Sequence, residues 1–140
     1  MTRWIAKTCD LETCLYLRRE VFVEEQNVPE QEEVDEYDAS AIHLLAFEDD
    51  TPVGTARIVI NGNVGKIGRV CVLKSQRGTG LGADLINAAL EQMRELPDVV
   101  TARLGAQTQA LVFYKRLGFT VFGSEYLDAG IPHFDMERKL

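Results

Sequence analysis

This sequence has few positively charged residues for its number of negatively charged ones. The 140 residues carry 15 Lys and Arg against 22 Asp and Glu, a net charge of −7, and no Lys or Arg occurs between Glu20 and Ala56. A nucleic-acid partner requires a basic surface to neutralise its phosphates, so this balance argues against nucleic acid. The acidic stretch is compatible with a solvated surface and also with a surface that attracts a cationic acceptor such as an amine.

Long apolar runs are also missing. No stretch approaches the ~18 apolar residues of a membrane span. The N-terminal MTRWIAKTCD has no apolar core of a signal peptide. We therefore expect a cytoplasmic protein without a membrane partner. The length fits one domain, residues 1–140, with one core. The sequence leaves the oligomeric state open, a homodimer included.

Cysteine is scarce, with Cys9, Cys14 and Cys71 as the three examples. They form no C-x-x-C pair and have no metal-type spacing, so we predict reduced thiols and no metal site. Each is expected to be a small buried hydrophobic residue. The alternative for Cys71, which lies near the candidate site described below, is a covalent role.

The hydrophobic pattern predicts a mixture of strands and helices. Asp10 can cap a first helix that runs to about Phe22, with Leu11, Leu15, Arg18 and Phe22 on one face. Further helices are expected before Pro97 and over 110–117, and the acidic stretch 24–38 is expected to be a loop with a short helix. Strands are predicted at 4–7, 42–47, 53–60, 66–73, 99–104, 119–122 and 132–138. The order, roughly β-α-βββ-α-β-α-ββ, implies an α/β fold (an α+β mixed sheet) with helices packed on it.

The segment QRGTGLG, Gln76 to Gly82, stands between a strand and a helix. Free N–H groups and the dipole at the start of that helix suit an anion. Gly78, Gly80 and Gly82 have no side chains to keep a phosphate from the backbone, and Arg77 adds a charged donor. We therefore predict a backbone cradle for the pyrophosphate of a nucleotide-bearing cofactor. The alternative is a tight turn that needs glycine flexibility alone.

Two other phosphate-binding motifs fit the cradle poorly. A P-loop requires G-x-x-x-x-G-K-S/T, and no Lys-Ser or Lys-Thr follows these glycines. A dinucleotide fold matches Gly78, Gly80 and Ala83, but it requires an acidic residue ~20 positions on. The next strand ends in Arg103, Leu104, Gly105 and Ala106 instead. NAD is therefore the weaker interpretation and coenzyme A the better one.

Two segments resemble signatures of the GNAT N-acetyltransferase superfamily. QRGTGLG after a Val-rich strand is similar to the signature Q/R-x-x-G-x-G/A, and ALVFYKRLGF, residues 110–119, is similar to A-x-x-F-Y-x-x-x-G-F. They occur in the family's order, and the element order over nearly the whole chain resembles the GNAT fold. The segments LRREVFVEEQNVP and GIPHFDM resemble a small bacterial subgroup, the ElaA- or YjcF-like proteins.

The resemblance implies transfer of an acetyl group from acetyl-CoA to a primary amine of a small molecule or peptide, by direct attack in a ternary complex. It assigns pantetheine to the main chain of Val70, Cys71 and Val72, and Gln107 stands where many members have Asn. Tyr114 falls where a hydroxyl often lies near the CoA sulfur, and the alternative for Tyr114 is a tyrosine packed on the core. The pyrophosphate would be held by Gln76, Arg77, Gly78, Thr79, Gly80, Leu81 and Gly82.

The base that deprotonates the amine is the least determined part. His133 is our first candidate, because the GIPH turn precedes the last strand, which borders the acceptor side in the fold that the resemblance implies. His43, Glu24 and Glu25 are the other candidates on the acceptor side. Three functions stay open: an acetyl-CoA-dependent N-acetyltransferase, a non-catalytic acyl-CoA-binding module and a nicotinamide oxidoreductase.

Overall fold

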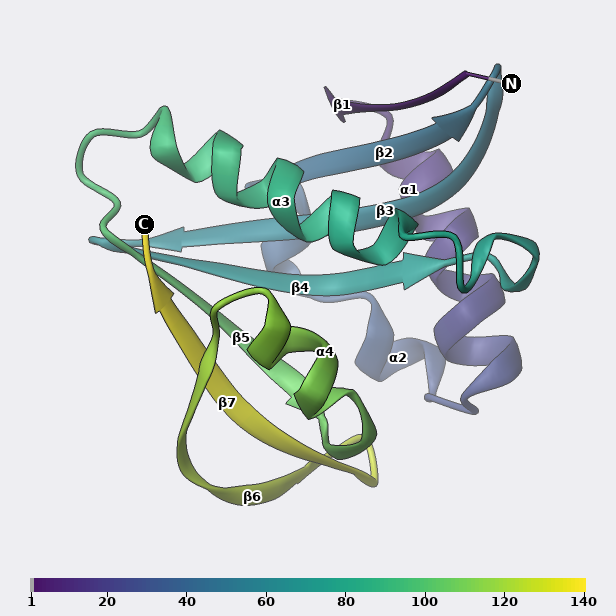
Figure 1. The fold of residues 1–140 in the computed structure, drawn as a ribbon. Helices are drawn as coiled ribbons and strands as arrows, with labels where there is room; N and C mark the ends of the chain where they lie inside the picture. Colours follow the sequence, from purple (N-terminus) through teal and green to yellow (C-terminus); the bar gives the residue numbers. More distant parts are fainter. Residues whose placement is uncertain (1) are drawn as a thin grey trace.

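The computed structural model describes residues 2–140 and contains one seven-stranded sheet in the order β1-β2-β3-β4-β5-β7-β6 (Figure 1). Every neighbouring pair is antiparallel except β4 and β5, which are parallel. The predicted mixed α/β sheet is therefore confirmed. The strands are β1 Arg3–Thr8, β2 Ile42–Glu48, β3 Thr51–Asn61, β4 Val64–Val72, β5 Thr101–Gln107, β6 Thr120–Asp128 and β7 Ile131–Lys139.

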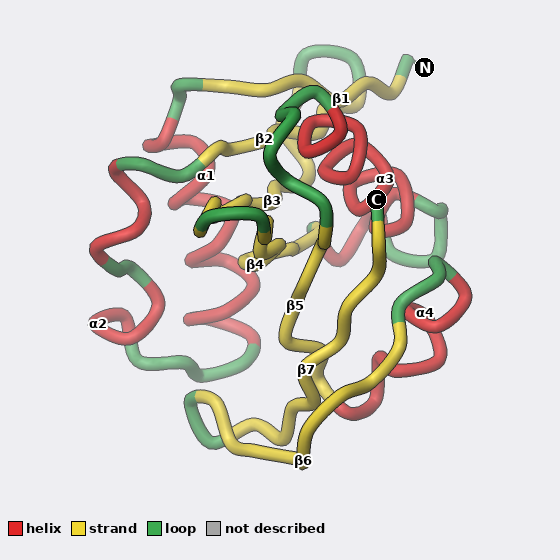
Figure 2. Tube along the Cα trace, turned by 90° about the vertical axis from the view of Figure 1, so that its left-hand side faces the viewer, coloured by secondary structure: helices red, strands yellow, loops and turns green. Residues whose placement is uncertain are grey.

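Helices cover both faces of the sheet (Figure 2). On one side lies α1 (Leu11–Arg18), which continues as a π-helix over Arg19–Glu25 and is followed by the short α2 (Glu30–Glu33). On the other side lie α3 (Leu81–Arg94) and α4 (Leu111–Arg116). Short 3-10 helices occupy Glu36–Ala39, Lys74–Gln76 and Thr108–Ala110. No helix among residues 2–140 is long and apolar enough to cross a membrane.

The first helix begins as predicted but buries a different face. Asp10 caps it, with its Oδ1 accepting the Thr13 N–H at 3.1 Å. The fully buried side chains are Cys14, Leu17, Arg18 and Val21. Of the face predicted from the sequence, only Arg18 is fully buried, while Leu11 and Phe22 pack against the same cluster partly buried. A stripe counted at α-helical spacing does not continue through the wider turn of a π-helix.

Two apolar clusters lie on the two faces of the sheet. The larger one joins α3 to the strands, and Leu85, Ile86 and Leu90 are fully buried in it. The smaller one joins α1 to β2 and β4 and contains both Cys14 and Cys71. These two thiols are buried as predicted, whereas Cys9 is exposed because it stands between β1 and α1.

The sheet splits where β4 and β5 separate. The two strands pair only over Val64–Ile67 and Thr101–Leu104. Beyond Ile67, β4 contains a bulge in which the register against β3 shifts and Arg69 adopts φ 50. A bulge bends its strand and interrupts pairing, so the main chain from Gly68 to Val72 is free of β5. Figure 1 shows the two strands diverging toward their carboxyl ends.

Candidate active site

A cavity of about 1390 Å³ opens where β4 and β5 separate. It is walled by β4 and β5, by the π-helix and α2 on one side, and by α4, β6 and β7 on the other. A split between two parallel strands leaves main-chain N–H and C=O groups without partners, and these suit an extended ligand that adds to the sheet. Of the residues predicted from the sequence, the lining includes Val70, Cys71, Val72, Arg77, Gln107, Tyr114 and His133.

The glycine cradle forms the start of α3. Gly80 is the N-cap residue at φ 87, and no side chain caps the helix. Gly78 has φ 76, and a Cβ placed on it would meet nothing within 4 Å. Positive φ values of this kind favour glycine, and the open space leaves the backbone accessible. The cradle therefore fits a phosphate group, with the Leu81 side chain buried beneath it.

Charged side chains hold the cradle from both ends. Arg3 of β1 donates from Nη1 to Thr79 Oγ1 at 3.0 Å and from Nη2 to Asp84 Oδ2 at 2.8 Å. Arg3 was not predictable as part of the cradle, because no local sequence pattern relates it to a loop 76 residues away. Arg77 donates from Nε and Nη2 to the Val72 carbonyl, both at 3.2 Å, and from Nη2 to Glu25 at 2.8 Å.

Tyr114 packs edge-on against Phe119 and lines the cavity. Burial raises the pKa of its hydroxyl to about 12, so the phenol keeps its proton at neutral pH and can donate it. Phe113 is 37% exposed and also lines the cavity. It lies 3.5 Å from where a Cβ on Gly82 would stand.

Cys71 lies on the β4 wall but is a poor nucleophile. Burial raises the pKa of its thiol to about 12. Nucleophilic attack requires the thiolate, and at neutral pH this group is a thiol. Its packing with Cys14 and Leu17 agrees with the structural role expected from the sequence.

His133 is buried in β7 and points one ring nitrogen at its own chain. Nδ1 lies 2.7 Å from the Ile131 carbonyl oxygen. A carbonyl only accepts, so Nδ1 carries the proton and Nε2 keeps its lone pair. Within residues 2–140, Nε2 has no hydrogen-bond partner. This tautomer suits a proton acceptor.

Gln107 connects the end of β5 with the π-helix. Its Nε2 donates to Gln26 Oε1 at 3.0 Å, and its Oε1 accepts from Gln109 Nε2 at 2.6 Å. The longer amide that stands in place of the expected Asn therefore connects two residues that line the cavity. Gln26 was not predictable from the sequence, because its partner is 81 residues away.

The remaining acceptor-side candidates do not line the cavity. Glu24 is exposed and lies 3.7 Å from Arg19. The hydrogen bond from Arg77 lowers the pKa of Glu25, which makes it a weaker base. His43 is buried in β2, with its Nε2 2.9 Å from the Asp38 carbonyl oxygen.

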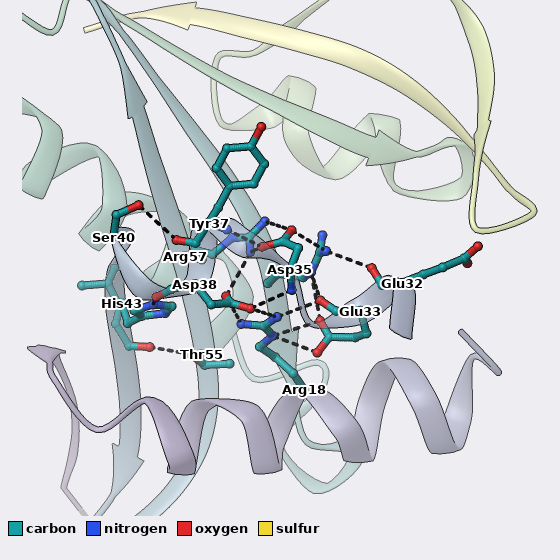
Figure 3. Close-up of polar contacts among 12 residues, drawn as sticks. Arg18, Glu32, Glu33, Asp35, Tyr37, Asp38, Ser40, His43, Thr55 and Arg57 are labelled. Atoms are coloured by element: carbon teal, nitrogen blue, oxygen red, sulfur yellow. Dashed lines mark hydrogen bonds and ion pairs between the residues drawn. The ribbon is translucent and has the colours of Figure 1, made fainter. Parts of the chain in front are cut away.

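Much of the acidic stretch is neutralised internally (Figure 3). Arg18, 1% exposed, forms ion pairs with Glu33 at 2.9 Å and Asp38 at 2.7 Å. Burial alone would raise the pKa of Asp38, but hydrogen bonds from Arg18, the Asp35 N–H and Arg57 outweigh it and hold that pKa well below its usual range. We call this group the buried ionic cluster: Arg18, Glu33, Asp35, Asp38, Arg57 and Arg69.

The buried ionic cluster also reaches the β4 bulge. Arg69 forms ion pairs with Glu33 at 2.9 Å and with Asp35 at 3.2 Å. Its left-handed backbone is unusual for a residue with a side chain, and these contacts fix it. The cluster therefore helps to set the course of the strand that walls the cavity.

Comparisons with known proteins agree with this geometry. The family model described as acetyltransferase (GNAT) domain matches residues 5–140. The chain is 44% identical over 129 residues to the uncharacterised N-acetyltransferase YjcF of Bacillus subtilis, which covers 91% of each chain. Two solved structures superpose well. An acyl-CoA N-acyltransferase from Pseudomonas aeruginosa has a TM-score of 0.84 at 33% identity, and Escherichia coli ElaA has 0.83 at 32%, each over 98% of both chains.

Of the three functions that the sequence left open, these findings support the enzyme that transfers acetyl groups. The sheet topology does not fit the nicotinamide interpretation. A dinucleotide-binding fold carries its glycine-rich turn at the first βα unit of a parallel sheet, whereas here the cradle follows the fourth strand of a largely antiparallel sheet. The chain belongs to the GNAT acetyltransferase family.

Proposed function

We propose that this protein transfers an acetyl group from acetyl-CoA to the primary amine of a small-molecule or peptide acceptor, by direct attack within a ternary complex. The observation that carries the proposal is the continuity of two features, the open edge of β4 and the uncapped start of α3. One suits an extended amide-bearing arm and the other suits a pyrophosphate. The similar Pseudomonas aeruginosa protein is described as an acyl-CoA enzyme, which agrees with this choice of donor.

The donor would be held mainly by main-chain groups. The N–H groups at the start of α3 and the Arg77 guanidinium would hold its pyrophosphate. Val70, Cys71 and Val72 would pair with pantetheine as an added strand, and a free N–H there can stabilise an oxyanion. Gln107 would contact the same arm from the β5 side. Arg77 would leave the Val72 carbonyl when it turns to the phosphates.

Acetyl-CoA supplies a thioester whose carbonyl carbon is attacked by the amine, so that a C–N bond forms, the C–S bond breaks and CoA leaves as a thiolate. His133 Nε2 would take the proton that the amine loses. The Tyr114 hydroxyl would donate a hydrogen bond to the sulfur as the C–S bond breaks and would keep its proton, because a thiol with a pKa near ~8.5 is more acidic than this buried phenol. The hydrogen bond would stabilise the developing negative charge, and the CoA thiolate would take its proton from solvent.

The test is an acetyl-CoA assay across polyamines, amino sugars and peptides, in which free thiol is measured. We expect thiol release that depends on an amine, together with a thermal shift on addition of CoA. A shift with NAD and none with CoA would refute the proposal. Binding of CoA without release of thiol for any amine in the set would refute the catalytic part.

A further inference from the structure

Three polar side chains converge above a residue that has none. They are Tyr126 of β6 and His133 and Asp135 of β7, and the residue below them is Gly105 of β5. A Cβ placed on Gly105 would lie 2.6 Å from Tyr126 Oη and 3.9 Å from both Asp135 Oδ1 and His133 Cδ2. All four residues line the cavity. The register explains the convergence, because Gly105 pairs with Asp135 and Tyr126 pairs with His133.

Asp135 differs from the other carboxylates in this cavity. Glu33 and Asp35 are each paired with arginines, and Glu32 and Asp128 are exposed to solvent. Asp135 is half-buried and accepts the Tyr126 hydroxyl at 2.7 Å. Within residues 2–140 it forms no ion pair. A carboxylate that is partly withdrawn from water and lacks a cation attracts one.

The surroundings of Gly105 offer hydrogen-bond acceptors. The Tyr126 hydroxyl donates a hydrogen bond to Asp135. Burial together with that hydrogen bond raises the pKa of Tyr126, so the phenol stays protonated. Its oxygen therefore presents lone pairs outward. The other carboxylate oxygen of Asp135 and Nε2 of His133 are two further acceptors. A primary ammonium has three N–H donors and no acceptor, which complements this set.

The position of the group also fits an acceptor. Gly105 follows Leu104, the last β5 residue that pairs with β4, so the group lies at the point where the two strands separate. The Arg103 side chain two residues earlier is already paired with Glu137 at 3.1 Å and does not neutralise Asp135.

We propose that Asp135, Tyr126 and His133 form the acceptor subsite above Gly105, and that it takes an unhindered primary amine in its ammonium form. This rests on the proposed acetyl transfer and gives that transfer a substrate class. The subsite excludes quaternary ammonium groups, which have no N–H to donate. Gly105 is required because a Cβ at this position would clash with the Tyr126 hydroxyl, 2.6 Å away, and displace it from the subsite.

Kinetics of charge-neutral variants test the subsite. With n-butylamine as acceptor, Asp135→Asn should raise the KM for the amine ~10- to 100-fold, as expected for loss of a charge-assisted hydrogen bond, and should change kcat less. The Kd for CoA should stay the same. Asp50→Asn, which removes an exposed carboxylate from the β2–β3 turn, should change neither value. Tyr126→Phe should also raise the KM for the amine. It retains the ring that stacks on His133, so it provides a second test if Asp135→Asn does not fold.

A binding experiment separates this inference from the proposed transfer. The amide signal of Gly105 in the ¹⁵N-labelled, CoA-saturated protein is followed by NMR during titration with n-butylamine or n-butyltrimethylammonium. Saturable shifts with the primary amine alone, lost in Asp135→Asn, support the subsite whether or not acetyl is transferred. Equal responses to both compounds, or an unchanged response in Asp135→Asn, overturn it. Acetyl transfer with the same KM for the amine in the wild type and in Asp135→Asn would support the proposed function and refute the subsite.

Discussion

At the scale of single residues, the buried Tyr114 gives a specific prediction about kcat. Burial raises its pKa to about 12, so its proton is available throughout the neutral and mildly alkaline range. We expect Tyr114→Phe to lower kcat about 100-fold, the order of magnitude for loss of a hydrogen-bond donor to a charge that develops in the transition state, with little change in the KM for acetyl-CoA. Steady-state kinetics measure both. Tyr16→Phe, on an exposed tyrosine, is the control, and an unchanged kcat in Tyr114→Phe would remove the tyrosine from the mechanism.

Neighbouring arginines on one helix give a matched test of the buried ionic cluster. Arg18 is 1% exposed and holds Glu33 and Asp38, whereas Arg19 is 55% exposed. Arg18→Met should lower the free energy of unfolding by ~3–5 kcal/mol, because it leaves two buried carboxylates short of a cation. Arg19→Met should cost ~1 kcal/mol or less. Urea denaturation measures both, and equal losses would contradict the assigned role.

Single residues also mark the limit of what the sequence could predict. The sequence pattern placed Arg18 on one helix face with apolar residues, and its side chain is fully buried. Its partners were not predictable, because Glu33 and Asp38 approach it only after the loop folds over α1. For the same reason the acidic stretch was open to a second interpretation, as an amine-attracting surface. Six of its carboxylates are paired with arginines: Glu24, Glu25, Glu30, Glu33, Asp35 and Asp38.

At the scale of elements, the cradle depends on its left-handed backbone. Gly80→Ala should strain the turn before α3 by ~1 kcal/mol and weaken CoA binding about tenfold, because the relaxed loop moves its N–H groups. Gly62→Ala is the matched control: Gly62 also has positive φ and open space around it, but it lies in the β3–β4 turn. Calorimetry should give both variants similar losses of stability and a changed Kd for Gly80→Ala alone.

The elements were predictable where the signal is local. Alternating apolar residues, glycines and the Asp10 cap predicted nearly every strand and helix. The π-helix, the β4 bulge at Arg69 and the separation of β4 from β5 were not predictable from local pattern, because each depends on contacts between distant segments. The glycine-rich turn before α3 was predicted from the sequence, whereas Arg3 beside it and the convergence on Gly105 emerged only from the paired strands.

At the scale of the whole molecule, the buried ionic cluster sets the response to acid. The pKa values of Asp35 and Asp38 are lowered in the folded protein, whereas an aspartate in the unfolded chain titrates near ~3.9. Their contribution is therefore present above pH ~4 and is lost as the pH falls below it. Urea unfolding at several pH values should show a plateau and then a steep loss of stability below pH ~4.

Asp50→Asn should leave the loss of stability below pH ~4 unchanged, because Asp50 lies outside the buried ionic cluster. Asp38→Asn should make the dependence of stability on pH below ~4 less steep and should lower the overall stability, since one of the titrating carboxylates is gone. A protein that became more stable on acidification would contradict the assigned network of ion pairs.

The two halves of the sheet separate at β4 and β5, and in the proposed reaction this opening would bring donor and acceptor together for direct attack. The most direct measurement is a stoichiometric reaction with isotope-labelled acetyl-CoA, followed by mass spectrometry of both the protein and the amine. We predict labelled amine and free CoA in equal amounts, and no labelled protein when the amine is omitted. Acetyl-protein formed without amine, or no labelled amine in its presence, would contradict direct transfer.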